Sequence, residues 1–101
     1  MAKTPIYEFE WDPAKARSNN KKHGVSFERG ATVFLDPHAL SMFDEDHSRT
    51  EDRWITMGQD RANLLLVVHH TFVERTDGIT TIRIFSARRA AKHEANQYEG
   101  K

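Results

Sequence analysis

The spacing of apolar residues changes at Asp36-Pro37, and this change constrains the fold more than any other feature of the sequence. Before it the spacing is helical, because Phe27, Ala31 and Phe34 fall at i, i+4 and i+7 behind Ser26, a suitable N-cap. After it, apolar and polar residues alternate with the period of two that is typical of strands. Helices followed by consecutive strands with short loops predict an α+β fold, with an antiparallel meander and helices on one face.

A strand and a helix are predicted before this region. Residues 6–11 alternate as a short strand, and Asp12-Pro13 then starts a helix, with Asp as the cap and Pro in the first helical position. The helix covers 14–23 and ends at Gly24, which suits the left-handed C′ position. This helix and the helix that Ser26 caps are the two N-terminal helices that precede the meander.

Four strands and a last helix are predicted in the rest of the chain. The segment 64–72 is the most hydrophobic and is expected at the centre of the sheet. Ser86 is expected to cap the C-terminal helix. The predicted elements are strands over 39–43, 53–59, 64–72 and 79–86, and a helix over 87–98.

Composition excludes several classes of protein. There is no cysteine, so disulfides, thiol catalysis and zinc fingers are excluded. The longest apolar run, 64–68, is too short to span a membrane, and residues 1–5 contain no apolar stretch of a secretory signal. We therefore expect one cytoplasmic domain over residues 1–101. Adjacent His69 and His70 would point to opposite faces of a strand, and no histidine spacing suits a metal, so no metal or cofactor is predicted.

The net charge of zero hides two basic segments. Residues 13–27 contain four Lys or Arg and no acid, and residues 78–93 contain four more, while an acidic block occupies 44–52 between them. Arg88 and Arg89 would lie in the first turn of the last helix, where free amides and guanidinium groups together bind phosphate. Arg83 would project from the sheet face opposite the core. The alternative is that Arg88 and Arg89 pair with the acidic block.

The motifs occur in a recognisable order. They are Phe9-Glu10-Trp11-Asp12, Lys22-His23-Gly24-Val25-Ser26-Phe27, Arg53-Trp54-Ile55-Thr56-Met57-Gly58, Arg83-Ile84-Phe85-Ser86-Ala87-Arg88-Arg89-Ala90, His93-Glu94 and Tyr98-Glu99. In this order, over residues 8–99, they resemble the BrnT toxin family of type II toxin–antitoxin systems. The resemblance implies a RelE-like ribonuclease fold, a co-encoded antitoxin as partner, and RNA cleavage that halts translation.

Cleavage of RNA without a metal requires an activated 2′-hydroxyl, a stabilised phosphorane and a protonated leaving oxygen. Arg83 and Arg88, with Arg53 as a third candidate, are expected to stabilise the phosphorane. Lys22 would position the RNA or act as the base, although cations at a helix C-terminus are also explained by capping. The predicted proton carriers are His93 and Glu94, and the predicted RNA contacts are Lys21, Lys22, His23, Arg89 and Phe85, with Trp54 as a further stacking candidate.

Two other functions remain open on the sequence. A nucleic-acid-binding module would carry the same cations as a broad stripe, whereas catalysis needs Arg83, Arg88 and a proton carrier within reach of one phosphate. A protein-interaction module would use the basic site to dock an acidic partner. An acidic or helical antitoxin element is expected near the last helix or over Arg83 and Arg88, in a complex that can contain a toxin dimer.

Overall fold

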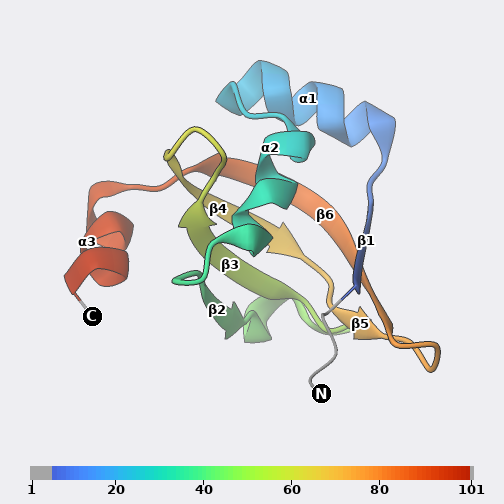
Figure 1. Ribbon diagram of the computed structural model, residues 1–101. Coiled ribbons are helices and arrows are strands. Elements are labelled where there is room, and N and C mark those ends of the chain that lie inside the picture. The colour runs from blue at the N-terminus through green and yellow to red at the C-terminus, as the bar shows by residue number, and fades with distance from the viewer. Residues whose placement is uncertain (1–5, 101) are drawn as a thin grey trace.

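The computed structural model describes residues 6–100, so the segment 1–5 discussed above lies outside it. A curved six-stranded sheet has the order β1-β6-β4-β3-β2, with the short β5 also paired to β6 (Figure 1). The elements are β1 (Ile6–Glu10), α1 (Pro13–His23), α2 (Phe27–Thr32), η1 (Val33–Leu35), β2 (Leu40–Phe43), η2 (Glu45–His47), β3 (Trp54–Gln59), β4 (Leu65–His70), β5 (Val73–Glu74), β6 (Ile79–Arg89) and α3 (Lys92–Gly100). The predicted α+β class is confirmed.

The sheet is mixed, although the sequence predicts only antiparallel neighbours. Strands β2, β3, β4 and β6 pair antiparallel in succession, and β4 is central as predicted. Strand β1 pairs parallel to β6, with Ile6 opposite Ile79 and Glu10 opposite Arg83. Because no turn joins these distant segments, the sequence contains no local signal of their pairing.

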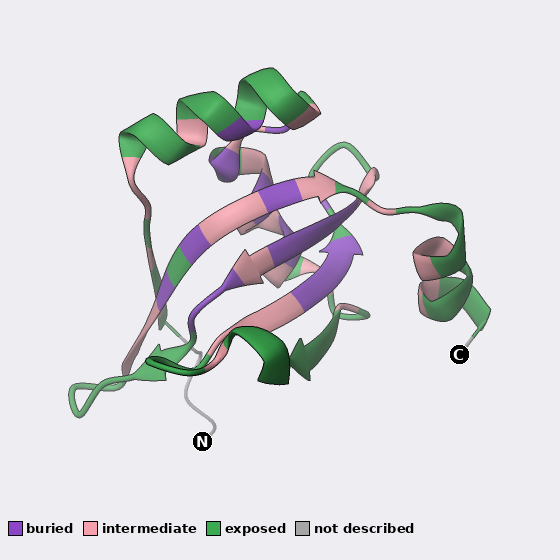
Figure 2. Cartoon of the chain, turned by 180° about the vertical axis from the view of Figure 1, so that it is seen from behind, coloured by how far each residue is buried: buried purple, intermediate pink, exposed green. Residues whose placement is uncertain are grey.

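The core lies between the sheet and the segment α2–η1, which covers one face (Figure 2). A Cβ added to Gly30 would lie 3.2 Å from the Cβ of Ala87, so glycine lets α2 approach β6 closely. This covered side is called the helix face, and the opposite side the open face. The buried cluster on the helix face comprises Val25, Phe27, Val33, Leu66, Val68, Ile82, Ile84 and Ala87.

Helix α1 lies beside β6 beyond the end of β1. The carboxamide of Asn19 accepts a hydrogen bond from the Ala87 N–H (3.2 Å) and donates to the Ala87 carbonyl (2.8 Å). It also donates to the Val25 carbonyl at 3.0 Å. Asn19 therefore satisfies the edge of β6 as a neighbouring strand would, which explains a poor helix former in the middle of α1.

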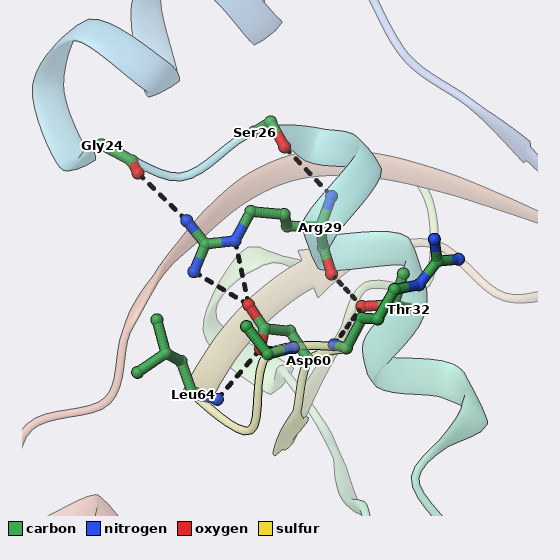
Figure 3. Close-up of polar contacts among 8 residues, drawn as sticks. Gly24, Ser26, Arg29, Thr32, Asp60 and Leu64 are labelled. Carbon is green, nitrogen blue, oxygen red and sulfur yellow. Dashed lines mark hydrogen bonds and ion pairs between the residues drawn. The ribbon is translucent and has the colours of Figure 1, made fainter.

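Asp60 fixes the turn between β3 and β4 and joins it to α2 (Figure 3). One carboxylate oxygen accepts the N–H groups of Ala62 and Leu64, and the other binds Arg29, whose Nε lies at 2.9 Å and Nη2 at 2.8 Å. Burial raises the pKa of Asp60, but the hydrogen bonds from Leu64 and Arg29 outweigh it and lower the pKa. The contacts between Asp60 and Arg29 thus hold this turn against α2.

The predicted helix over 87–98 is wrong in its first third. Residues 87–89 continue β6, with Ala87 opposite Val68 and Arg89 opposite Leu66, and Ser86 lies within the strand. Pairing with the apolar central strand and burial of Ala87 outweigh the helix propensity of alanine, which is a weak preference. Arg88 and Arg89 therefore do not lie at a helix N-terminus.

Helix α3 stands beyond the end of β6, away from α1 and α2, so the helices do not all cover one face (Figure 2). None of its residues is buried. The Tyr98 hydroxyl donates to Asp36 at 2.6 Å, and Glu94 binds Arg88. Polar contacts thus contribute much of its attachment. Within the described residues, no helix is long and apolar enough to cross a membrane.

Candidate functional site

The open face carries a basic hollow of about 610 Å³. Its cations come from different elements: Lys15 from the start of α1, Arg53 from the residue before β3, Arg75 from the residue after β5, and Arg83 from the middle of β6. Arg83 is exposed between buried Ile82 and Ile84, so its predicted projection is confirmed. The residues that line the basic hollow are Glu10, Lys15, Glu51, Arg53, Thr71, Val73, Arg75, Thr81, Arg83 and Phe85.

Phe85 lies at the centre of these cations. The Arg53 guanidinium carbon is 4.2 Å from the centroid of the Phe85 ring, and the Lys15 ammonium is 5.6 Å from it. Both distances are within the range of cation–π attraction. The ring thereby attracts both cations and helps to keep them near the hollow.

Two arginines of the basic hollow, Arg53 and Arg83, have weakly held partners, whereas Arg75 pairs with Asp77 at 2.8 Å and with Glu8 at 3.1 Å. Arg83 lies 3.5 Å from Glu10 and Arg53 lies 3.6 Å from Glu51, all four side chains being partly exposed. The Nε of Arg53 is buried and has no hydrogen-bond partner among the described residues. A buried unpaired donor is unfavourable. The exposed part of the Arg53 side chain can donate to a phosphate oxygen.

A second hollow of about 590 Å³ lies between the open face and α3, and we call it the α3 hollow. In it Arg88 forms a bidentate pair with Glu94, each of the two N···O distances being 2.8 Å. The alternative that Arg88 pairs with the acidic block is therefore wrong. The lining residues are Leu40, Met42, Ile55, Met57, Val67, His69, Arg88, His93, Glu94 and Gln97.

Glu94 is held in its ionised form. The hydrogen bond from Arg88 lowers the pKa of Glu94 to about 2, and the Ala91 N–H also donates to this carboxylate at 2.8 Å. The same pair raises the pKa of Arg88. Glu94 thus caps the start of α3 and orients Arg88, and this suits a positioning role better than proton transfer.

The structure does not bring Arg83 and Arg88 to a single phosphate. Arg88 follows Arg83 by five positions along β6, which is about 16 Å at about 3.3 Å per residue. Arg53, Arg83 and Phe85 share the basic hollow, while Arg88, His93 and Glu94 share the α3 hollow. The open face therefore has two cationic centres in a row along β6.

The other predicted contacts lie outside both hollows. Lys21 and Lys22 are exposed in the last turn of α1, His23 is half-buried there, and Arg89 is exposed at the end of β6. Gly24 ends the helix at φ 68°, as the capping argument predicts. Trp54 faces a different hollow, on the helix face.

Lys15, Glu10 and Glu51 line the basic hollow, although the sequence does not predict them as members of a site. Lys15 could have been found, since it precedes Lys22 by seven residues and thus lies on the same side of a helix. The carboxylates gave no signal, because they come from separate segments. Within residues 6–100, no three His, Asp or Glu side chains gather as ligands of a metal would.

Comparison with known proteins identifies the family. The crystal structure of the Brucella abortus ribonuclease toxin, BrnT, has a TM-score of 0.60 and 20% sequence identity to this chain, and the match covers 86% of this chain and 99% of that chain. Its fold is therefore shared. No curated protein sequence matches. A family model described as ribonuclease toxin, BrnT, of type II toxin–antitoxin system matches residues 11–94, and the chain therefore belongs to this family of ribonuclease toxins.

Proposed function

We propose that this ribonuclease toxin cleaves RNA without a metal, with the scissile phosphate in the basic hollow. The observation that carries the proposal is the convergence of Arg53 and Arg83 on one hollow. Arginine remains charged and binds phosphate through a fork of donors. Such donors stabilise the charge that develops on a phosphorane.

The proposed chemistry uses residues of the same hollow. The 2′-oxygen attacks phosphorus, its proton passes to the Glu10 carboxylate beside Arg83, and the bond from phosphorus to the 5′-oxygen breaks. The leaving oxygen takes a proton from the Lys15 ammonium. The products are a 2′,3′-cyclic phosphate and a 5′-hydroxyl. Phe85, predicted to stack a base, has Arg53 over its ring, so here it positions Arg53.

The remaining predicted residues are proposed to hold RNA on either side of the scissile phosphate. Arg88, oriented by Glu94, would bind a neighbouring phosphate, with His93 beside it in the α3 hollow. Lys21, Lys22 and His23 would contact the strand where it passes α1, and exposed Arg89 where it leaves β6. These contacts are electrostatic and depend on salt.

The type II toxin–antitoxin family implies an antitoxin as partner and RNA as substrate. We propose that an acidic antitoxin element covers the two hollows of the open face, and that the complex can contain two toxins. Cleavage of translated RNA would halt translation, and we propose that it takes place in the cytoplasm. A non-catalytic RNA-binding module is the second candidate, favoured by the separation of Arg83 from Arg88.

Alanine variants of Arg53 and Arg83 test the proposal against Arg61→Ala, an exposed arginine of the β3–β4 turn outside both hollows. Loss of one stabilising donor should reduce cleavage about 100-fold or more, as at an oxyanion hole. Arg61→Ala should retain activity. Full cleavage by both Arg53→Ala and Arg83→Ala would refute the placement of the scissile phosphate in the basic hollow. RNA binding without cleavage by the unaltered chain would favour a non-catalytic RNA-binding module.

A further inference from the structure

A third hollow, of about 510 Å³, lies on the helix face of the sheet, away from the RNA site proposed above. Four aromatic side chains line it, and Tyr7 touches two of them edge-on, Phe34 at 6.2 Å and Phe72 at 6.4 Å between ring centroids. Trp54 is the fourth. We call it the aromatic hollow.

In the aromatic hollow, the hydroxyl groups of Thr56 and Ser41 each donate their proton in a fixed direction. His70 Nδ1 lies 2.8 Å from the Thr71 carbonyl, which can only accept, so Nδ1 carries the proton and Nε2 must accept. Thr56 therefore donates its hydroxyl proton to Nε2 at 2.7 Å. Ser41 in turn donates to Thr56 at 2.7 Å. The proton of Ser41 is thus committed, and Ser41 offers only lone pairs to a ligand.

The charged groups of the aromatic hollow are all anionic. Asp36 and Glu74 line it, and within residues 6–100 no lysine or arginine does. Burial raises the pKa of Asp36, but hydrogen bonds from Gln59 and Tyr98 outweigh this effect and keep it ionised. Burial lowers the pKa of His70 to about 4, so the imidazole adds no positive charge near neutrality.

This combination selects a cation that donates hydrogen bonds. Aromatic faces attract cations, most often guanidinium groups, and the exposed lone pairs of Ser41 require a donor. An RNA phosphate in this hollow would be repelled by two carboxylates, and no cationic side chain among the described lining residues would offset that repulsion. The occupant is therefore neither the substrate nor an anion.

The hollow lies beside an edge that a protein can reach. Strand β2 ends the sheet, and its Ser41 lines the aromatic hollow while its Leu40 and Met42 line the α3 hollow on the open face. The acidic block 44–52 follows it directly. A protein segment along this edge would reach both faces and would meet negative charge on the helix face.

We propose that the aromatic hollow receives an arginine side chain of the antitoxin, as an anchor separate from the element that covers the RNA site. The inference rests on the proposed function only for the identity of the partner. The chemistry of the hollow itself follows from its aromatic rings, Ser41 and Glu74.

The first test probes the hollow with methylguanidinium and with methylurea, its neutral analogue, by amide and indole chemical shifts. Saturable shifts of the Trp54 indole and the Thr56 amide with methylguanidinium alone are expected, and weaker binding in Glu74→Gln. Equal shifts with methylurea, or shifts elsewhere only, would overturn the assigned ligand class.

The second test measures binding of the purified co-encoded antitoxin by calorimetry. Ser41→Ala and Glu74→Gln should each weaken binding at least tenfold, while Glu28→Gln, an exposed acid outside the hollow, should change it less than twofold. Unchanged affinity in both variants would overturn the partner, even where methylguanidinium binds. In the absence of antitoxin, Ser41→Ala and Glu74→Gln should cleave RNA at the unaltered rate. If the unaltered chain binds antitoxin but cleaves no RNA, the proposed function is refuted and this inference is not.

Discussion

The guanidinium of Arg53 lies over the ring of Phe85, with 4.2 Å between its central carbon and the ring centroid. Phe85 lies in β6, and Arg53 lies directly before β3, a strand that is not a neighbour of β6 in the sheet. Phe85 is also the extra residue of β6 at a register shift against β4, because His69 pairs with Ser86 and His70 with Ile84. The bulge therefore lies where β6 presents its cation-binding ring, a location common for functional sites.

Phe85→Leu should reduce RNA cleavage about tenfold. The cation–π contact with Arg53 contributes about 1 kcal/mol, and without it the guanidinium is less well placed beside Arg83. Phe85→Tyr, which keeps an aromatic face, should retain most activity. The measurement is the cleavage rate of each variant at equal folded concentration, and equal loss in both variants would contradict a positioning role.

Glu94→Gln should remove part of the pH dependence of stability. The pKa of Glu94 in the folded chain is about 2, below its ordinary value of 4.5, so its contribution is present above about pH 4.5 and is lost as the pH falls toward 2. The variant should be about 2 kcal/mol less stable near neutrality, because a charge-assisted hydrogen-bond pair is lost. Thermal unfolding at pH 7 and pH 3 checks this, since the difference between the two proteins should shrink at pH 3.

Asn19→Ala should destabilise the fold by about 3 kcal/mol. The substitution leaves the buried N–H and carbonyl of Ala87 without their partner, and unpaired buried groups are costly. Asn20→Ala is the matched control, because Asn20 is the exposed neighbour and should change stability by less than about 0.5 kcal/mol. Urea unfolding would contradict the account if both variants were equally stable.

Asp60→Ala should lower the free energy of unfolding by about 3 kcal/mol, since it leaves Arg29 without its ion-pair partner and removes the acceptor of two N–H groups in the turn. Arg29→Ala should lower the free energy of unfolding less than Asp60→Ala does, because the hydrogen bonds from Ala62 and Leu64 to Asp60 remain. Chemical denaturation ranks the two variants, and the reverse order would show that the turn does not depend on the Asp60 carboxylate.

Local signals predict most elements of this fold. Asp12-Pro13 and Gly24 bound α1 as expected, Ser26 caps α2 through the Arg29 N–H, and alternation places Ile82 and Ile84 in the core. The parallel pairing of β1 with β6 and the extension of β6 through Arg89 were not predictable in this way. Both depend on partners distant in sequence, namely β1 and the apolar centre of β4.

The site shows the same division. Arg53 and Arg83 were chosen by residue type and position in a strand, and they share one hollow. Arg88 and Arg89 were chosen for a helix N-terminus that does not exist, although Arg88 does line a neighbouring hollow with His93 and Glu94. Lys15 and Asn19 were not assigned roles, because their contacts with β6 arise only when α1 packs beside that strand.

The most direct test of the central claim is cleavage of free RNA by the purified chain in excess EDTA, with analysis of the product ends. Cleavage should continue in EDTA, leave 2′,3′-cyclic or 3′-phosphate ends, and fall at least 100-fold in Arg83→Ala. Cleavage that stops in EDTA and returns with magnesium or manganese, or that leaves 3′-hydroxyl ends, would contradict the central claim.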